Sequence, residues 1–144
     1  MRTRISIVGL ILALGIVFSA CKKDPVTPKT DEELQLEKLE KTWIVESGSN
    51  KVTIAENDVT DEWTSFELTF TEGNYTSSGA ASTDVWPAGG TWSFATDDVT
   101  IIQRDGIDIS INVSDNTLLM TFTYTTGGRL DGVDGNWVFN MVPK

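Results

Sequence analysis

The 144-residue sequence contains no histidine and only one cysteine, Cys21. One thiol cannot form an internal disulfide framework, and without histidine there is no thiol–imidazole pair for nucleophilic catalysis. Basic residues are also scarce, because 11 lysines and arginines stand against 21 acidic residues, for a formal charge of −10. Nucleic acid and anionic lipid are both polyanions and are therefore poor partners for this chain. A cationic partner is compatible with the charge, although solubility alone also explains it.

Long hydrophobic runs are limited to Ile5–Phe18, which follows Arg2 and Arg4. The run is too short for a comfortable membrane span and is typical of a secretory signal. It ends at Ser19-Ala20, directly before Cys21, and this junction resembles the lipobox of bacterial lipoproteins, with Phe18 where leucine is usual. The resemblance implies that residues 1–20 are a signal peptide and that Cys21 becomes the lipidated N-terminus, with acyl chains that make anchoring stable. The alternative is an ordinary secretory signal followed by an unrelated cysteine.

Residues 21–30 contain Pro25, Pro28 and charges of both signs, a composition that predicts a stiff, solvated tether. Their Cys-Lys-Lys-Asp start resembles the signal that sends some Gram-negative lipoproteins to the outer face of the outer membrane. An anchor facing the periplasm is the alternative. Removal of residues 1–20 takes away two arginines and no acidic residue, so the mature charge is about −12.

A short helix is predicted to follow the tether. Thr30 or Asp31 can cap it, acidic residues fill its first turn, and Leu34, Leu36 and Leu39 follow. A helix of about three turns is marginal alone. We therefore expect its leucines to pack against the rest of the domain, at one end of a barrel.

From Thr42 onward, apolar and polar residues alternate, which is typical of half-buried strands. The alternating segments are 42–46, 51–55, 66–71, 74–78, 91–95, 99–103, 107–113, 118–124 and 136–142. Connections between them are short, which favours sequential antiparallel pairing. The sequence thus predicts an all-β fold: one domain over residues 31–144, an antiparallel up-and-down barrel of about eight strands with a short N-terminal helix.

Several segments carry a family resemblance: Leu39-Glu40-Lys41-Thr42-Trp43, residues 66–76, residues 85–94, and residues 118–123 followed by Gly127-Gly128-Arg129. Together they resemble the lipocalin-like domain of small Gram-negative bacterial lipoproteins, over about residues 39–142. Lys41 stands where the Gly-x-Trp motif of lipocalins has glycine. The resemblance implies an apolar ligand site in the barrel and a late arginine, Arg129, stacked on Trp43 by a cation–π contact. The alternative for Arg129 is an ordinary loop residue.

The barrel interior has two interpretations. A barrel of about eight strands is either filled by side chains or holds one small ligand. The expected inward residues are bulky: Trp43, Phe66, Phe70, Trp92, Ile109, Phe122, Trp137 and Phe139. This bulk favours a filled interior, and an apolar pocket of lipocalin type is the alternative.

Trp63 and Trp86 lie in connections rather than strands. Loop tryptophans can stack on sugar rings, and neighbouring Asp61, Glu62 and Asp84 could accept hydrogen bonds from hydroxyl groups. Alternatively, these loops fold over the barrel ends and bury both indoles.

Catalytic and metal-binding patterns are weak. Asp131-Gly132-Val133-Asp134-Gly135 has two carboxylates but lacks the spaced oxygen ligands of an EF-hand, and turn chemistry explains it. We therefore expect no enzymatic activity, cofactor or metal. The expected function is a binding or accessory lipoprotein of the outer membrane, for a small apolar ligand, with surface binding of carbohydrate or of an envelope protein as the alternative.

Overall fold

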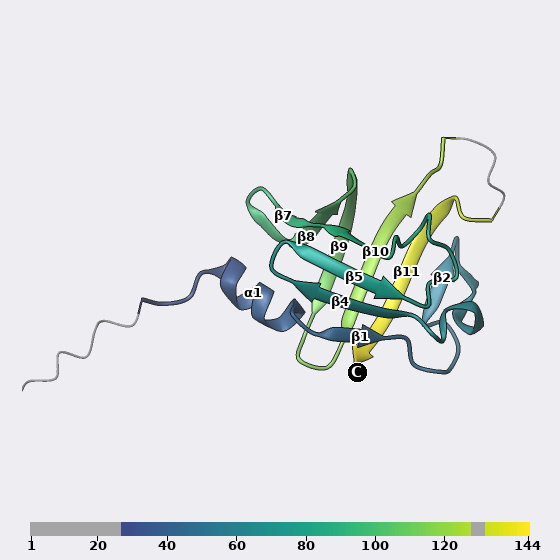
Figure 1. The fold of residues 1–144 in the computed structure, drawn as a ribbon, viewed down its shortest axis with the longest axis horizontal. Coiled ribbons are helices and arrows are strands. Elements are labelled where there is room, and N and C mark those ends of the chain that lie inside the picture. The colour runs from purple at the N-terminus through teal and green to yellow at the C-terminus, as the bar shows by residue number, and fades with distance from the viewer. Residues whose placement is uncertain (1–26, 128–131) are drawn as a thin grey trace, which may run out of the picture.

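The computed structural model describes residues 27–127 and 132–144 (Figure 1). Its elements are α1 (Asp31–Leu39), β1 (Thr42–Ile44), β2 (Val52–Ile54), β3 (Asn57–Asp58), the 3-10 helix η1 (Thr60–Trp63), β4 (Glu67–Thr71), β5 (Asn74–Ser78), β6 (Gly89–Thr91), β7 (Ser93–Ala95), β8 (Asp98–Arg104), β9 (Ile107–Val113), β10 (Leu118–Tyr124) and β11 (Gly135–Pro143). The predicted all-β fold with one short α-helix is confirmed. No helix among the described residues has the length and hydrophobicity needed to cross a membrane.

The strands form an antiparallel sheet that is nearly closed into a barrel, in the order β6-β5-β4-β1-β11-β10-β9-β8-β7. The two end strands, β6 and β7, are separated in the chain only by Trp92. One bent segment therefore pairs with β5 through its first half and with β8 through its second half. The eleven strands among the described residues exceed the predicted number of about eight, because this bend divides the predicted segment 91–95 between β6 and β7 and because the short β3 pairs with β2, the strand predicted by the segment 51–55.

Aromatic side chains occupy the barrel interior. All eight residues expected to point inward are buried. The ring of Trp63 packs edge-on against Phe66 and Phe139, with centroid separations of 5.1 and 4.9 Å. Phe139 in turn stacks on Phe122 and on Trp137. Such contacts add to the stabilisation from burial, and the described core is a single continuous cluster between Leu39 and Met141.

Helix α1 begins with a capping box. The Thr30 hydroxyl accepts a hydrogen bond from the Glu33 N–H, and the Glu33 carboxylate accepts one from the Thr30 N–H. At the other end Leu39 is fully buried, and its carbonyl accepts a hydrogen bond from the Trp43 indole. The helix contacts β8 and β9. The expectation that all three leucines dock is wrong for Leu34, which is 43% exposed, whereas Leu36 packs against the core.

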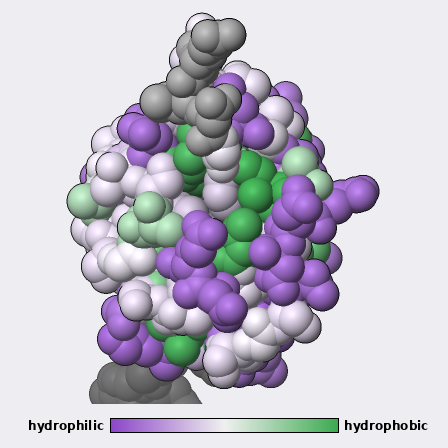
Figure 2. Space-filling model, turned by 90° about the vertical axis from the view of Figure 1, so that its right-hand side faces the viewer, coloured by the Kyte–Doolittle hydropathy of each residue, from purple (hydrophilic) through white to green (hydrophobic). Residues whose placement is uncertain are grey.

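A hydrogen-bonded corner holds η1 against the barrel. The buried Thr60 hydroxyl accepts from the N–H groups of Lys51 and Val52 and donates to the Asp58 carboxylate. The Thr60 hydroxyl, with the N–H groups of Asn50 and Thr60, lowers the pKa of Asp58. Figure 2 shows this side of the molecule, opposite α1, with a hydrophobic area bordered by hydrophilic residues. The corner fixes η1 and so places Trp63 inside the barrel.

Candidate functional site

Two of the predicted site residues, Cys21 and Arg129, lie outside the described residues. Trp43 is fully buried, and its indole N–H is satisfied by the Leu39 carbonyl at 3.0 Å. The Lys41 ammonium lies 5.6 Å from the centroid of the Trp43 ring. Trp43 therefore has a cationic neighbour within the described residues, and its pairing with Arg129 stays a prediction.

Trp63 and Trp86 are core residues. Their relative exposures are 1% and 0%, because η1 and the segment between β5 and β6 fold inward. The Trp86 ring packs against Tyr75 and Phe122, at 5.7 and 6.0 Å between centroids. Sugar stacking needs an exposed indole face, and neither residue presents one in this structure. The structure agrees with the alternative interpretation, in which these loops bury both indoles.

Arg104 is a buried cation at the end of β8, with only 2% of its surface exposed. Its Nη2 donates to the Val85 carbonyl at 2.8 Å, and its guanidinium carbon lies 4.4 Å from the centroid of the Trp86 ring. Its Nη1 donates to the Asp105 carboxylate at 3.1 Å. Arg104 therefore fastens the end of β8 to the segment that precedes β6, across the top of the barrel.

Tyr75 completes the surroundings of this guanidinium. Its hydroxyl accepts a long hydrogen bond of 3.5 Å from Arg104 Nη1, and burial raises the pKa of the Tyr75 phenol. The hydroxyl therefore stays neutral and acts as an acceptor here. Among the described residues, Arg104 Nε and Trp86 Nε1 are buried without a hydrogen-bond partner. Donors thus outnumber acceptors around Arg104, and each unmatched donor costs about 1–3 kcal/mol.

Sequence reasoning did not single out Arg104. A signal was available, because Arg104 and the buried Ile102 are two residues apart and so share one face of β8. Its partners in the loop before β6 could not be read from the sequence.

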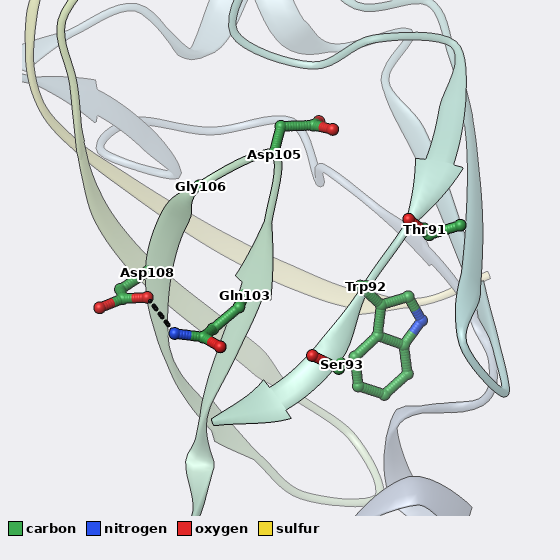
Figure 3. Close-up of a pocket in the computed structure, with 7 residues that line it drawn as sticks. All are labelled: Thr91, Trp92, Ser93, Gln103, Asp105, Gly106 and Asp108. Atoms are coloured by element: carbon green, nitrogen blue, oxygen red, sulfur yellow. Dashed lines mark hydrogen bonds between the residues drawn. The ribbon is translucent and has the colours of Figure 1, made fainter. Parts of the chain in front are cut away.

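The turn after Arg104 projects between two clefts. Asp105 and Gly106 both have positive φ angles, 52° and 79°, as a two-residue hairpin of type I′ requires. The smaller cleft, of about 360 Å³, lies between this turn and residues 91–93 (Figure 3). The larger cleft, of about 530 Å³, is lined by residues 105–108 and 123–125. The β8–β9 hairpin therefore has an open groove on each side.

The side chains of the smaller cleft do not converge on one point. Gln103 donates to the Asp108 carboxylate at 2.9 Å, while Figure 3 shows the Trp92 indole turned away from both. The Trp92 N–H is held by the carbonyls of Thr71 and Asn74, both at 2.9 Å. This cleft therefore offers no aromatic platform for a sugar ring.

Charge at the two clefts has one sign. Of the described residues that line them, Asp105 and Asp108 are acidic and none is basic. The Asp105 side chain is 55% exposed. In the described part of the chain no group of three or more metal-ligating side chains is found. The arrangement is suited to holding a positively charged partner group.

Comparisons with protein-family models, with curated proteins and with solved structures found no match to this chain.

Proposed function

We propose that this chain is a lipid-anchored lipoprotein of the Gram-negative outer membrane, with a lipocalin-like barrel that binds a partner through its surface and catalyses no reaction. We propose binding at the surface rather than inside the barrel because of one observation: aromatic rings from η1, β10 and β11 pack together in the barrel interior. A barrel filled by its own side chains has no room for an internal ligand, so binding would take place on its outer surface. The acidic clefts beside the β8–β9 hairpin are concave parts of that surface.

The anchor in this proposal is Cys21, joined to the barrel by the tether of residues 21–30. It rests on the lipobox resemblance and on the absence of any other cysteine from the sequence. Figure 1 shows α1, which follows the tether, at the left of the barrel, and the β8–β9 turn at its top. A partner could therefore reach the hairpin without displacing α1.

Two measurements test this function. Radiolabelled palmitate should enter the wild-type chain in Gram-negative cells and fail to enter Cys21→Ala, whereas equal labelling of both refutes the anchor. The second measurement uses residues 27–144, which contain the whole described core. Native mass spectrometry after incubation with envelope lipids should show no stoichiometric lipid adduct. A specific adduct would replace surface binding with an apolar-ligand carrier.

A further inference from the structure

The strands β9 and β10 separate before either strand ends. Their ladder pairs Leu118 with Val113 and finishes at Thr121 with Ser110. The same register would place Phe122 opposite Ile109 and then Thr123 opposite Asp108. Neither pair forms, although all four residues lie within strands. Thr123 and Asp108 instead line the larger cleft. Figure 1 shows the upper ends of β9 and β10 diverging. Two strand edges therefore face each other across an open groove.

Both walls of the larger cleft are held apart by contacts elsewhere. On one side, β9 stays paired with β8 up to the turn, and Arg104 fastens that turn to the Val85 carbonyl and the Trp86 ring. On the other side, β10 stays paired with β11 as far as Tyr124, and the Thr126 N–H donates to Asp134 at 2.8 Å. The groove is thus formed in advance, and a preformed site lowers the entropy lost on binding.

The lining of the larger cleft indicates the chemistry of its occupant. Strand edges recognise an extended polypeptide by main-chain hydrogen bonds, while pockets along the edge select alternate side chains. Asp108 supplies negative charge, and Asp105 adds an exposed carboxylate that also pairs with Arg104 at 3.1 Å. The half-buried Ile107 and Tyr124 supply apolar surface. The chain as a whole carries a net charge of −10, which disfavours a second copy of itself. These features match a positively charged strand.

We propose that the larger cleft binds an extended segment of a partner protein, inserted as a strand between β9 and β10, with basic side chains directed at Asp105 and Asp108. The strand residues that line the groove, 107–108 on β9 and 123–125 at the end of β10, cover two or three positions, so the inserted segment spans about three residues. This inference rests on the proposed surface-binding function and names the class of partner.

The test uses residues 27–144 and a synthetic peptide, Thr-Lys-Val-Lys-Val-Lys-Thr. Its affinity is measured by calorimetry at low and physiological salt, and hydrogen exchange locates the contact. We expect saturable binding that weakens with salt, and slower exchange at the amides of Asp108 and Thr123. A peptide with glutamate in place of lysine should not bind. A peptide N-methylated at alternate residues keeps its charge but cannot pair fully, and should bind at least tenfold more weakly.

Matched variants locate the charge. Asp105→Asn and Asp108→Asn should each weaken binding by up to about fivefold, the effect of one exposed ion pair. Both variants should keep the fold. Asparagine at position 105 suits the turn, and the amide oxygen of asparagine at position 108 can still accept a hydrogen bond from Gln103. Asp97→Asn removes the same charge in the β7–β8 turn and should leave binding unchanged. Circular dichroism verifies folding of each variant.

Three results would overturn the proposal: no binding of the lysine peptide, equal binding of the N-methylated peptide, or the same weakening by Asp97→Asn. None of these results would change the conclusion drawn from the palmitate and lipid-adduct measurements about the anchor and the barrel interior. Conversely, a specific lipid adduct would remove the proposed function whatever the peptide does.

Discussion

Replacement of Arg104 by methionine tests whether this buried cation stabilises the barrel. Methionine keeps an unbranched stem in the core but removes the guanidinium. The Val85 carbonyl then loses a donor at 2.8 Å, and the Trp86 ring loses a cation at 4.4 Å. The perturbation should loosen the end of β8 without opening a large cavity.

The magnitude follows from three contributions. A hydrogen bond from a charged donor contributes about 2 kcal/mol. A desolvated cation–π contact contributes about 2 kcal/mol more. Arg104 Nε is buried without a hydrogen-bond partner, so its removal raises the free energy of unfolding by about 2 kcal/mol. Arg104→Met should therefore lower the free energy of unfolding by about 2 kcal/mol, which corresponds to a fall of roughly 8 °C in Tm for a domain of this size.

Urea denaturation followed by tryptophan fluorescence measures this change, and Asp105→Asn is its control. The Asp105 side chain is 55% exposed, so loss of this ion pair should cost less than about 1 kcal/mol. Unchanged stability of Arg104→Met would refute the reasoning. So would an Asp105→Asn variant as unstable as Arg104→Met, because the exposed ion pair would then be the stabilising contact.

Gly79→Ala should lower the free energy of unfolding, measured by urea denaturation, by at least about 2 kcal/mol more than Gly73→Ala does. Both glycines have φ near +70°, but of the two only Gly79 would bring its new Cβ against a backbone carbonyl, at 2.0 Å. Equal losses of stability would contradict this. In the same assay, Leu39→Ala should lower the free energy of unfolding by about 2–5 kcal/mol, because Leu39 is fully buried, and Leu34→Ala by less than about 0.5 kcal/mol, because Leu34 is exposed. A large loss of stability in Leu34→Ala would contradict the exposed position of Leu34. The pKa of Asp58 is lowered in the fold, so its stabilising contribution is complete above the ordinary pKa and is lost as pH falls through the folded value. The stability difference between wild type and Asp58→Asn, measured by thermal unfolding at several pH values, should therefore shrink below about pH 4, and a difference that grows on acidification would refute it.

Strand positions could be predicted because side chains alternate between the two faces of a sheet. The inward direction of Ile109 and Phe122 follows from that alternation alone, and both are buried. The bend at Trp92 could not be predicted in this way. Thr91 and Ser93 continue the alternation through it, so nothing local shows that the two halves of the segment pair with different strands.

The candidate site depended on contacts between distant segments. Burial of Trp63 and Trp86 is decided by how η1 and the segment before β6 fold inward, and both residues have polar neighbours in sequence that suggested exposure. The separation of Asp108 from Thr123 is equally hidden, because each keeps the pattern of its own strand. Alternation specifies the face of a side chain and leaves the partner strand undetermined.

The pairings of β11 also constrain the order in which this barrel can fold. β11 is the last strand, and it joins β1, β2 and β10, with Pro143 opposite Trp43. The loop enclosed by that contact spans nearly the whole domain, and contacts between such distant residues slow folding. Closure must therefore wait until residue 143 has been made. For a lipoprotein exported as proposed above, the barrel would stay open until synthesis reached β11, while local hairpins such as β4–β5 and β8–β9 could pair earlier.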